Sequence, residues 1–177
     1  STFLAGNDLS MNPYTLNWDD LASENNSGSG IAATLRFQVL DDAEGVAEIG
    51  VQVNQNSTFD VDFNEVRFVT IDGKVILFEE TTVETTSGST TQTTTVTTAT
   101  EPGAAACISA GTVNGNPGEV VYVPIMLENN PGIIALSLSI TYDDTKLRLL
   151  GAEDGKILGT STFLAGNDLS MNPYTLN

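Results

Sequence analysis

Carboxylates are the candidate reactive side chains of this sequence, and four adjacent pairs of identical acids stand out among them. These are Asp19-Asp20, Asp41-Asp42, Glu79-Glu80 and Asp143-Asp144. Two carboxyl groups hydrolyse a glycoside only when both converge on one bond. Neighbouring residues of a strand point to opposite faces, so these pairs cannot cooperate as acid and base. The chain has no histidine, which removes the commonest general base. We therefore expect no catalytic residues and no enzymatic activity.

A second candidate chemistry is calcium binding by the segment Asp60–Asn64, which reads DVDFN. An EF-hand loop needs glycine at its sixth position and glutamate at its twelfth, where this chain has Glu65 and Ile71. The EF-hand interpretation therefore fails, although looser use of these carboxylates by a loop stays open. The single cysteine, Cys107, lies in an apolar run and is expected to be a structural thiol. We expect no metal site and no cofactor.

The composition indicates one soluble domain with a very acidic surface. The chain has 177 residues, 40% of them hydrophobic, and a formal net charge of −17. Such a charge repels nucleic acid and anionic membranes, and it suits either solubility alone or a partner with basic patches. No membrane span is visible in the sequence.

Short alternating strands must position any site. The period-2 pattern predicts that apolar residues in each of four segments share one buried face. These residues are Tyr14, Leu16 and Trp18; Ile31, Ala33, Leu35, Phe37 and Val39; Ile49, Val51 and Val53; and Ile134, Leu136, Leu138, Ile140 and Tyr142. Pro124 predicts an edge strand or a bulge. Asp72-Gly73 predicts a hairpin between strands at 66–70 and 73–78. Many short strands separated by turn signals indicate an antiparallel sandwich.

An identical segment of seventeen residues occurs twice, at 1–17 and again at 161–177. The two copies start 160 positions apart, which predicts one period of a tandem array plus an overlap. Both ends would then fall inside a folding unit. Between them, fourteen of the twenty residues 81–100 are Thr or Ser, a composition typical of linkers. We expect residues 1–78 to be the C-terminal half of a module, 79–105 a Thr-rich linker, and 106–177 the N-terminal half of a module.

Four motifs between Gly111 and Gly151 make the chain resemble a cohesin module. In order they are the turn GTVNGNPGE, the strand VYVP, the turn NNPGI and the strand end YDDTKL. The Trp18 strand, the segment GIAATLRFQV and the closing IDGKVILF fit the same pattern in register. The resemblance covers about 130 residues, everything but the linker.

The resemblance implies an all-β, nine-stranded jelly-roll sandwich whose first and last strands run parallel. It also implies a non-catalytic module that docks dockerin-bearing enzymes onto the scaffoldin of an extracellular or cell-surface cellulosome, for polysaccharide degradation. The dockerin, and not the cohesin, carries calcium. In cohesins the outer side of one sheet meets a dockerin helix, and small residues at Ala135 and Ser137 are expected to allow its close approach. The implied dockerin face consists of Ala135, Ser137, Ser139, Asn17, Asp19, Thr34, Arg36, Gln52 and Asn54.

Alternatives stay open at this point. The two halves could complete one permuted sandwich within the chain, or pair between chains and self-associate through swapped halves. The module could instead be a structural repeat of an extracellular fibre or adhesin. A carbohydrate-binding module is a further alternative, but such modules display exposed aromatic rows. Here Trp18, Phe37 and Tyr142 fall in the buried phase.

Overall fold

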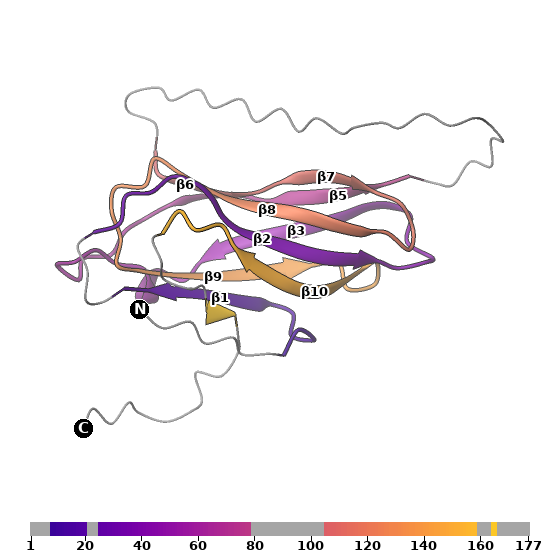
Figure 1. Ribbon diagram of the computed structural model, residues 1–177, viewed down its shortest axis with the longest axis horizontal. Coiled ribbons are helices and arrows are strands. Elements are labelled where there is room, and N and C mark those ends of the chain that lie inside the picture. Colours follow the sequence, from indigo (N-terminus) through magenta and orange to yellow (C-terminus); the bar gives the residue numbers. More distant parts are fainter. Residues whose placement is uncertain (1–7, 21–24, 79–104, 159–163, 166–177) are drawn as a thin grey trace.

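The chain folds into a two-layer, all-β sandwich, as predicted (Figure 1). The computed structural model describes residues 8–20, 25–78, 105–158 and 164–165. The first sheet has the order β11-β1-β9-β3-β5-β7. Its strands are β1 (Tyr14–Asp19), β3 (Gly45–Val53), β5 (Gly73–Leu77), β7 (Thr112–Gly115), β9 (Ala135–Tyr142) and β11 (Leu164–Ala165). A single 3-10 turn, η1 (Gln55–Ser57), follows β3.

The second sheet has the order β10-β2-β8-β6-β4. Its strands are β2 (Gly30–Val39), β4 (Val69–Ile71), β6 (Cys107–Ala110), β8 (Val120–Glu128) and β10 (Leu147–Asp154). Both sheets combine strands from both halves of the sequence, since β9 lies between β1 and β3, and β8 pairs with β2. The predicted Thr-rich linker at 79–105 lies almost entirely outside the described residues.

The core forms between the two sheets because the alternating strands turn their apolar sides inward. Tyr14 and Leu16 are fully buried and Trp18 is 2% exposed, as their phase predicts. From the second sheet, Phe37 meets Tyr142 of the first edge-on, with ring centroids 5.1 Å apart. Burying each such side chain stabilises the fold by about 1.5–3 kcal/mol. One core therefore joins both halves of the described chain.

The predicted hairpin at Asp72-Gly73 is wrong, because the chain crosses there from one sheet to the other. β4 lies in the second sheet and pairs in parallel with β6, whereas β5 lies in the first and pairs in parallel with β7. A Cβ atom at Gly73 would collide with the carbonyl oxygen of Gly111, where the neighbouring strand makes the same crossing. This close backbone approach requires glycine. The expected parallel pairing of the first and last family strands is confirmed, with each divided between the sheets.

A register shift between Ile31 and Ala33 changes the predicted phase of β2. Ala32 and Ala33 are both buried, and Ile31 is 41% exposed instead of facing the core. Pro124 is a residue of β8 and lies opposite Thr34 of β2. The pairing of β6 with β8 ends one residue earlier, at Ala110 with Ile125. Proline is thus tolerated where β6 leaves its neighbour.

The two copies of the repeated segment contribute different strands. The first copy supplies most of β1, and the second supplies β11, which pairs with β1 through Leu16 with Ala165 and Asn17 with Leu164. The sandwich is therefore assembled from both copies.

Candidate partner-binding face

The outer face of the first sheet is set by the register of β9, its central strand. Leu136, Leu138 and Ile140 are at most 1% exposed and point into the core. The alternate residues of β9 therefore point outward. Their cross-strand partners on β1 and β3 lie on the same face, because directly opposed side chains share a side of the sheet. These pairs are Asp19 with Ala135, Asn17 with Ser137, Thr15 with Ser139, Gln52 with Ser139 and Gly50 with Thr141.

Seven of the nine predicted dockerin-face residues come together on this face. They are Asn17, Asp19, Gln52, Asn54, Ala135, Ser137 and Ser139. Asn54 joins the group through two hydrogen bonds to Ser137, one from its backbone N–H to the carbonyl oxygen and one from Nδ2 to Oγ, both 2.9 Å. We call the outward residues of β1, β9 and β3, together with Asn54, the β9 face.

Thr34 and Arg36 do not belong to the β9 face, which corrects their predicted position. Both lie on β2, in the second sheet, where Arg36 forms an ion pair with Glu153 of β10 at 3.9 Å. The period-2 alternation of β2 correctly predicts that both side chains point outward. It carried no information about which of the two sheets contains β2, so the two residues lie on a different outer surface.

The small residues Ala135 and Ser137, which were expected to allow close approach of a partner helix, are covered by another segment of this chain. Ala135 is 6% exposed and Ser137 is 4% exposed. The segment after η1 lies along the start of β9. The N–H of Ser137 donates to Oγ1 of the fully buried Thr58 at 3.2 Å, and Phe59 pairs with Ala135. The accessible members of this group are those that are half-buried or exposed, namely Asn17, Asp19, Ser139, Gln52 and Asn54.

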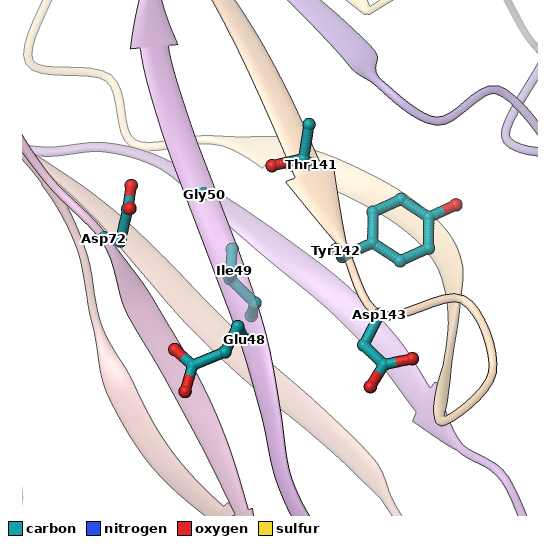
Figure 2. Close-up of a pocket in the computed structure, with 7 residues that line it drawn as sticks. All are labelled: Glu48, Ile49, Gly50, Asp72, Thr141, Tyr142 and Asp143. Atoms are coloured by element: carbon teal, nitrogen blue, oxygen red, sulfur yellow. The ribbon is translucent and has the colours of Figure 1, made fainter.

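The β9 face also contains residues that the sequence analysis missed, at the opposite end from Phe59. A hollow of about 420 Å³ lies there, lined mainly by residues of β3 and of the end of β9. Figure 2 shows the side chains that line it. Thr15, Gly50 and Thr141 stand two positions from Asn17, Gln52 and Ser139, so the same period-2 phase would have found them. The hollow is lined by Glu48, Ile49, Gly50, Asp72, Thr141, Tyr142 and Asp143.

The electrostatics of this surface are acidic. Asp72 accepts a hydrogen bond from the Val51 N–H at 2.9 Å. Hydrogen bonds from Thr145 and Lys146 lower the pKa of Asp143, which also forms an ion pair with Lys146 at 3.3 Å. Burial raises the pKa of Asp19. Among the described residues, no group of three or more Cys, Asp or Glu side chains is arranged to hold a metal ion. The arrangement offers recognition through hydrogen bonds and charge.

The comparisons with known proteins bear on the strand at the centre of this face. Residues 107–177 match the family model of the cohesin domain. These residues belong to the cohesin family. No curated protein and no solved structure matches the chain.

The cohesin match includes β9, the middle strand of the β9 face, and the four motifs that carried the resemblance. Cohesins are non-catalytic binding domains, so the match agrees with a binding surface and not with an active site. β1 and β3, the flanking strands of the face, come from residues outside the matched range and complete the same sheet. In the described part of the chain, no helix is long and apolar enough to cross a bilayer.

Cys107 occupies the first position of β6, opposite Glu128. It is half-buried, and burial followed by the Glu128 charge raises its thiol pKa. A raised pKa lowers the thiolate fraction at neutral pH, which disfavours nucleophilic chemistry.

Proposed function

We propose that this cohesin module docks a dockerin through its β9 face, and thereby holds a dockerin-bearing enzyme on an extracellular cellulosome scaffold. The observation that carries the proposal is the register that unites β1, β9 and β3. It places polar side chains from three adjacent strands on one outer surface of a cohesin-family sandwich. β9 has eight residues, or roughly 27 Å of strand, which matches about five turns of a helix.

The charge of the module supports a partner with basic side chains. The chain carries a formal net charge of −17, and Glu48, Asp72 and Asp143 surround the hollow at one end of the face. Complementary charges speed association and set the orientation of the partners. The dockerin residues that meet this face are therefore expected to include lysine or arginine, and association is expected to slow as salt concentration rises.

The test is binding of a dockerin panel by calorimetry, with Ser139→Arg against Thr34→Arg. Both positions are half-buried and point outward from central strands, but Ser139 lies on the β9 face and Thr34 on the second sheet. We expect Ser139→Arg to weaken binding at least tenfold through steric exclusion, and Thr34→Arg to leave the dissociation constant within about threefold. A dockerin that tolerates Ser139→Arg but not Thr34→Arg would place the site on the other sheet.

Two further measurements distinguish dockerin binding from the alternative functions. Calcium chelation should abolish binding through the dockerin and leave the melting temperature of this chain unchanged. Binding to cellulose without any dockerin binding would instead favour a carbohydrate-binding module.

We also propose that residues 1–78 and 106–177 form one permuted module, joined by the linker at 79–105. Shared sheets and a shared core within one chain support this arrangement. Light scattering should then give the monomer mass at every dilution. A mass that rises with concentration would favour swapped halves and a fibre-like repeat.

A further inference from the structure

The loop after β3 presents unusually large apolar side chains to water. Phe63 is 72% exposed and Val61 is 44% exposed, within the short segment Asp60–Asn64. An exposed phenylalanine surrounded by carboxylates is not explained by packing within the described residues. The same loop was noticed in the sequence only for its resemblance to a calcium site.

The register places this loop on the β9 face. Phe59 and Ala135 exchange backbone hydrogen bonds of 3.2 and 3.3 Å as an antiparallel pair. Opposed side chains share a side of the sheet, so the Phe59 ring stands beside Ala135 on the outer surface. The Phe63 ring packs on Phe59, with centroids 5.5 Å apart and planes tilted by 32°. The two rings form an aromatic pair at one end of the β9 face, and the hollow lies at the other end.

The loop is held in one shape by its polar groups. The Asp60 carboxylate accepts hydrogen bonds from the backbone N–H groups of Asp62 and Asn64, both 2.9 Å. Val61 donates its N–H to the Asn25 side chain at 2.7 Å, which fastens the loop to a distant part of the chain. A ring presented by such a loop loses little conformational freedom when a partner covers it.

The backbone of Phe63 is strained as well as exposed. Its φ of +60° lies in the left-handed region, which bulky side chains rarely adopt. Glycine or asparagine would occupy this position at lower cost. The chain thus keeps a residue that is unfavourable both for its backbone conformation and for its exposed apolar surface. Strain of this kind concentrates at functional sites and ligand clamps.

We propose that Phe63 is the apolar anchor of the β9 face, and that its ring inserts into an apolar pocket of the docked partner with Val61 beside it. The inference rests on the proposed function and names a residue that determines its specificity. Exposed Asp62 and Glu65 flank the ring, so the matching pocket is bordered by lysine or arginine. The occupant is a dockerin surface that combines an apolar pocket with basic side chains.

The test measures dockerin affinity for Phe63→Gly, Phe63→Asn and Phe63→Leu. Glycine and asparagine both suit the left-handed backbone, so these variants should fold with an unchanged or higher melting temperature. Both should weaken binding about 30-fold, the loss typical of an interface hot spot. Phe63→Leu keeps an apolar side chain and should lose less. Tyr122→Ala is the matched control, because Tyr122 is 54% exposed on β8 of the other sheet, and its affinity should stay within about threefold of wild type.

The outcomes separate this inference from the proposed function. If Ser139→Arg abolishes binding while Phe63→Gly and Phe63→Asn bind like wild type, the face is correct and the anchor is wrong. If the Phe63 variants change the oligomeric mass and not the dockerin affinity, the ring belongs to a contact between copies of this chain, and the anchor is again wrong. If wild-type protein binds no dockerin of the panel, both proposals fall.

Discussion

The assignment of β1 to the first copy of the repeat leads to an unusual stability prediction. Leu16 is fully buried in β1, between Leu138 of β9 and Ala165 of β11 in the register of the sheet. The second copy contains the same residue as Leu176. Because the position beside β9 is already filled by Leu16, only one of two chemically identical leucines should matter for stability.

The perturbation is Leu16→Ala, compared with Leu176→Ala and with the double variant. Truncating a fully buried leucine removes transfer free energy and leaves a cavity, which together cost about 2–5 kcal/mol. Leu16 has strand neighbours on both sides and the core beneath it, so little collapse into the cavity is expected, and we take about 3 kcal/mol. For a chain of this size that corresponds to a fall of roughly 6–12 °C in melting temperature.

Urea unfolding followed by tryptophan fluorescence provides the assay, since Trp18 is the only tryptophan and lies two residues from Leu16. The midpoint should fall for Leu16→Ala and stay close to wild type for Leu176→Ala, with the slope unchanged. The double variant should match Leu16→Ala.

Two results would contradict this prediction. Equal losses for both single variants would mean that the second copy also occupies a buried position. A small loss for Leu16→Ala, with a full loss only in the double variant, would mean that Tyr174–Asn177 can replace Tyr14–Asn17 in the sheet.

Two further predictions concern buried groups. Burial raises the pKa of Tyr14 to about 12, so the folded state holds the phenol proton more tightly than the unfolded state does. The stability that this difference contributes is complete below about pH 10 and is lost as the pH rises through 12. Its buried hydroxyl has no hydrogen-bond partner in the described part of the chain, so Tyr14→Phe should leave stability at pH 7 unchanged or about 1 kcal/mol higher and should reduce the alkaline loss in urea titrations. Gly73→Ala should destabilise the fold by about 1–3 kcal/mol, because the new Cβ atom meets backbone atoms where β4 crosses into β5. Gly45→Ala is the comparison, because its Cβ atom meets no atom within 4 Å, and it should cost less despite the φ of +78°. Calorimetric melting that ranks the two variants the other way would contradict the crossing geometry.

Local alternation in the sequence was enough to predict the fold class and the inner and outer sides of most strands. Tyr14, Leu16 and Trp18 turn inward as their alternation requires, and so do the alternate residues Leu136, Leu138, Ile140 and Tyr142. The alternation is a property of the extended backbone, in which successive side chains point to opposite sides. It therefore survives whatever the strand pairs with, and the family motifs added the expected parallel pairing of the first and last strands.

The sets of outward residues that share a surface depend on how the strands assemble in three dimensions. Thr34 and Arg36 point outward as predicted but lie on the second sheet, and Ile31 leaves the core at a register shift. Asp72-Gly73 reads locally like a hairpin, yet the chain crosses between sheets there because Gly73 can approach Gly111. Sheet membership and register depend on hydrogen bonds between strands far apart in the sequence, which local periodicity does not encode. The same long-range pairing, of Phe59 with Ala135, brings the Phe63 ring onto the β9 face.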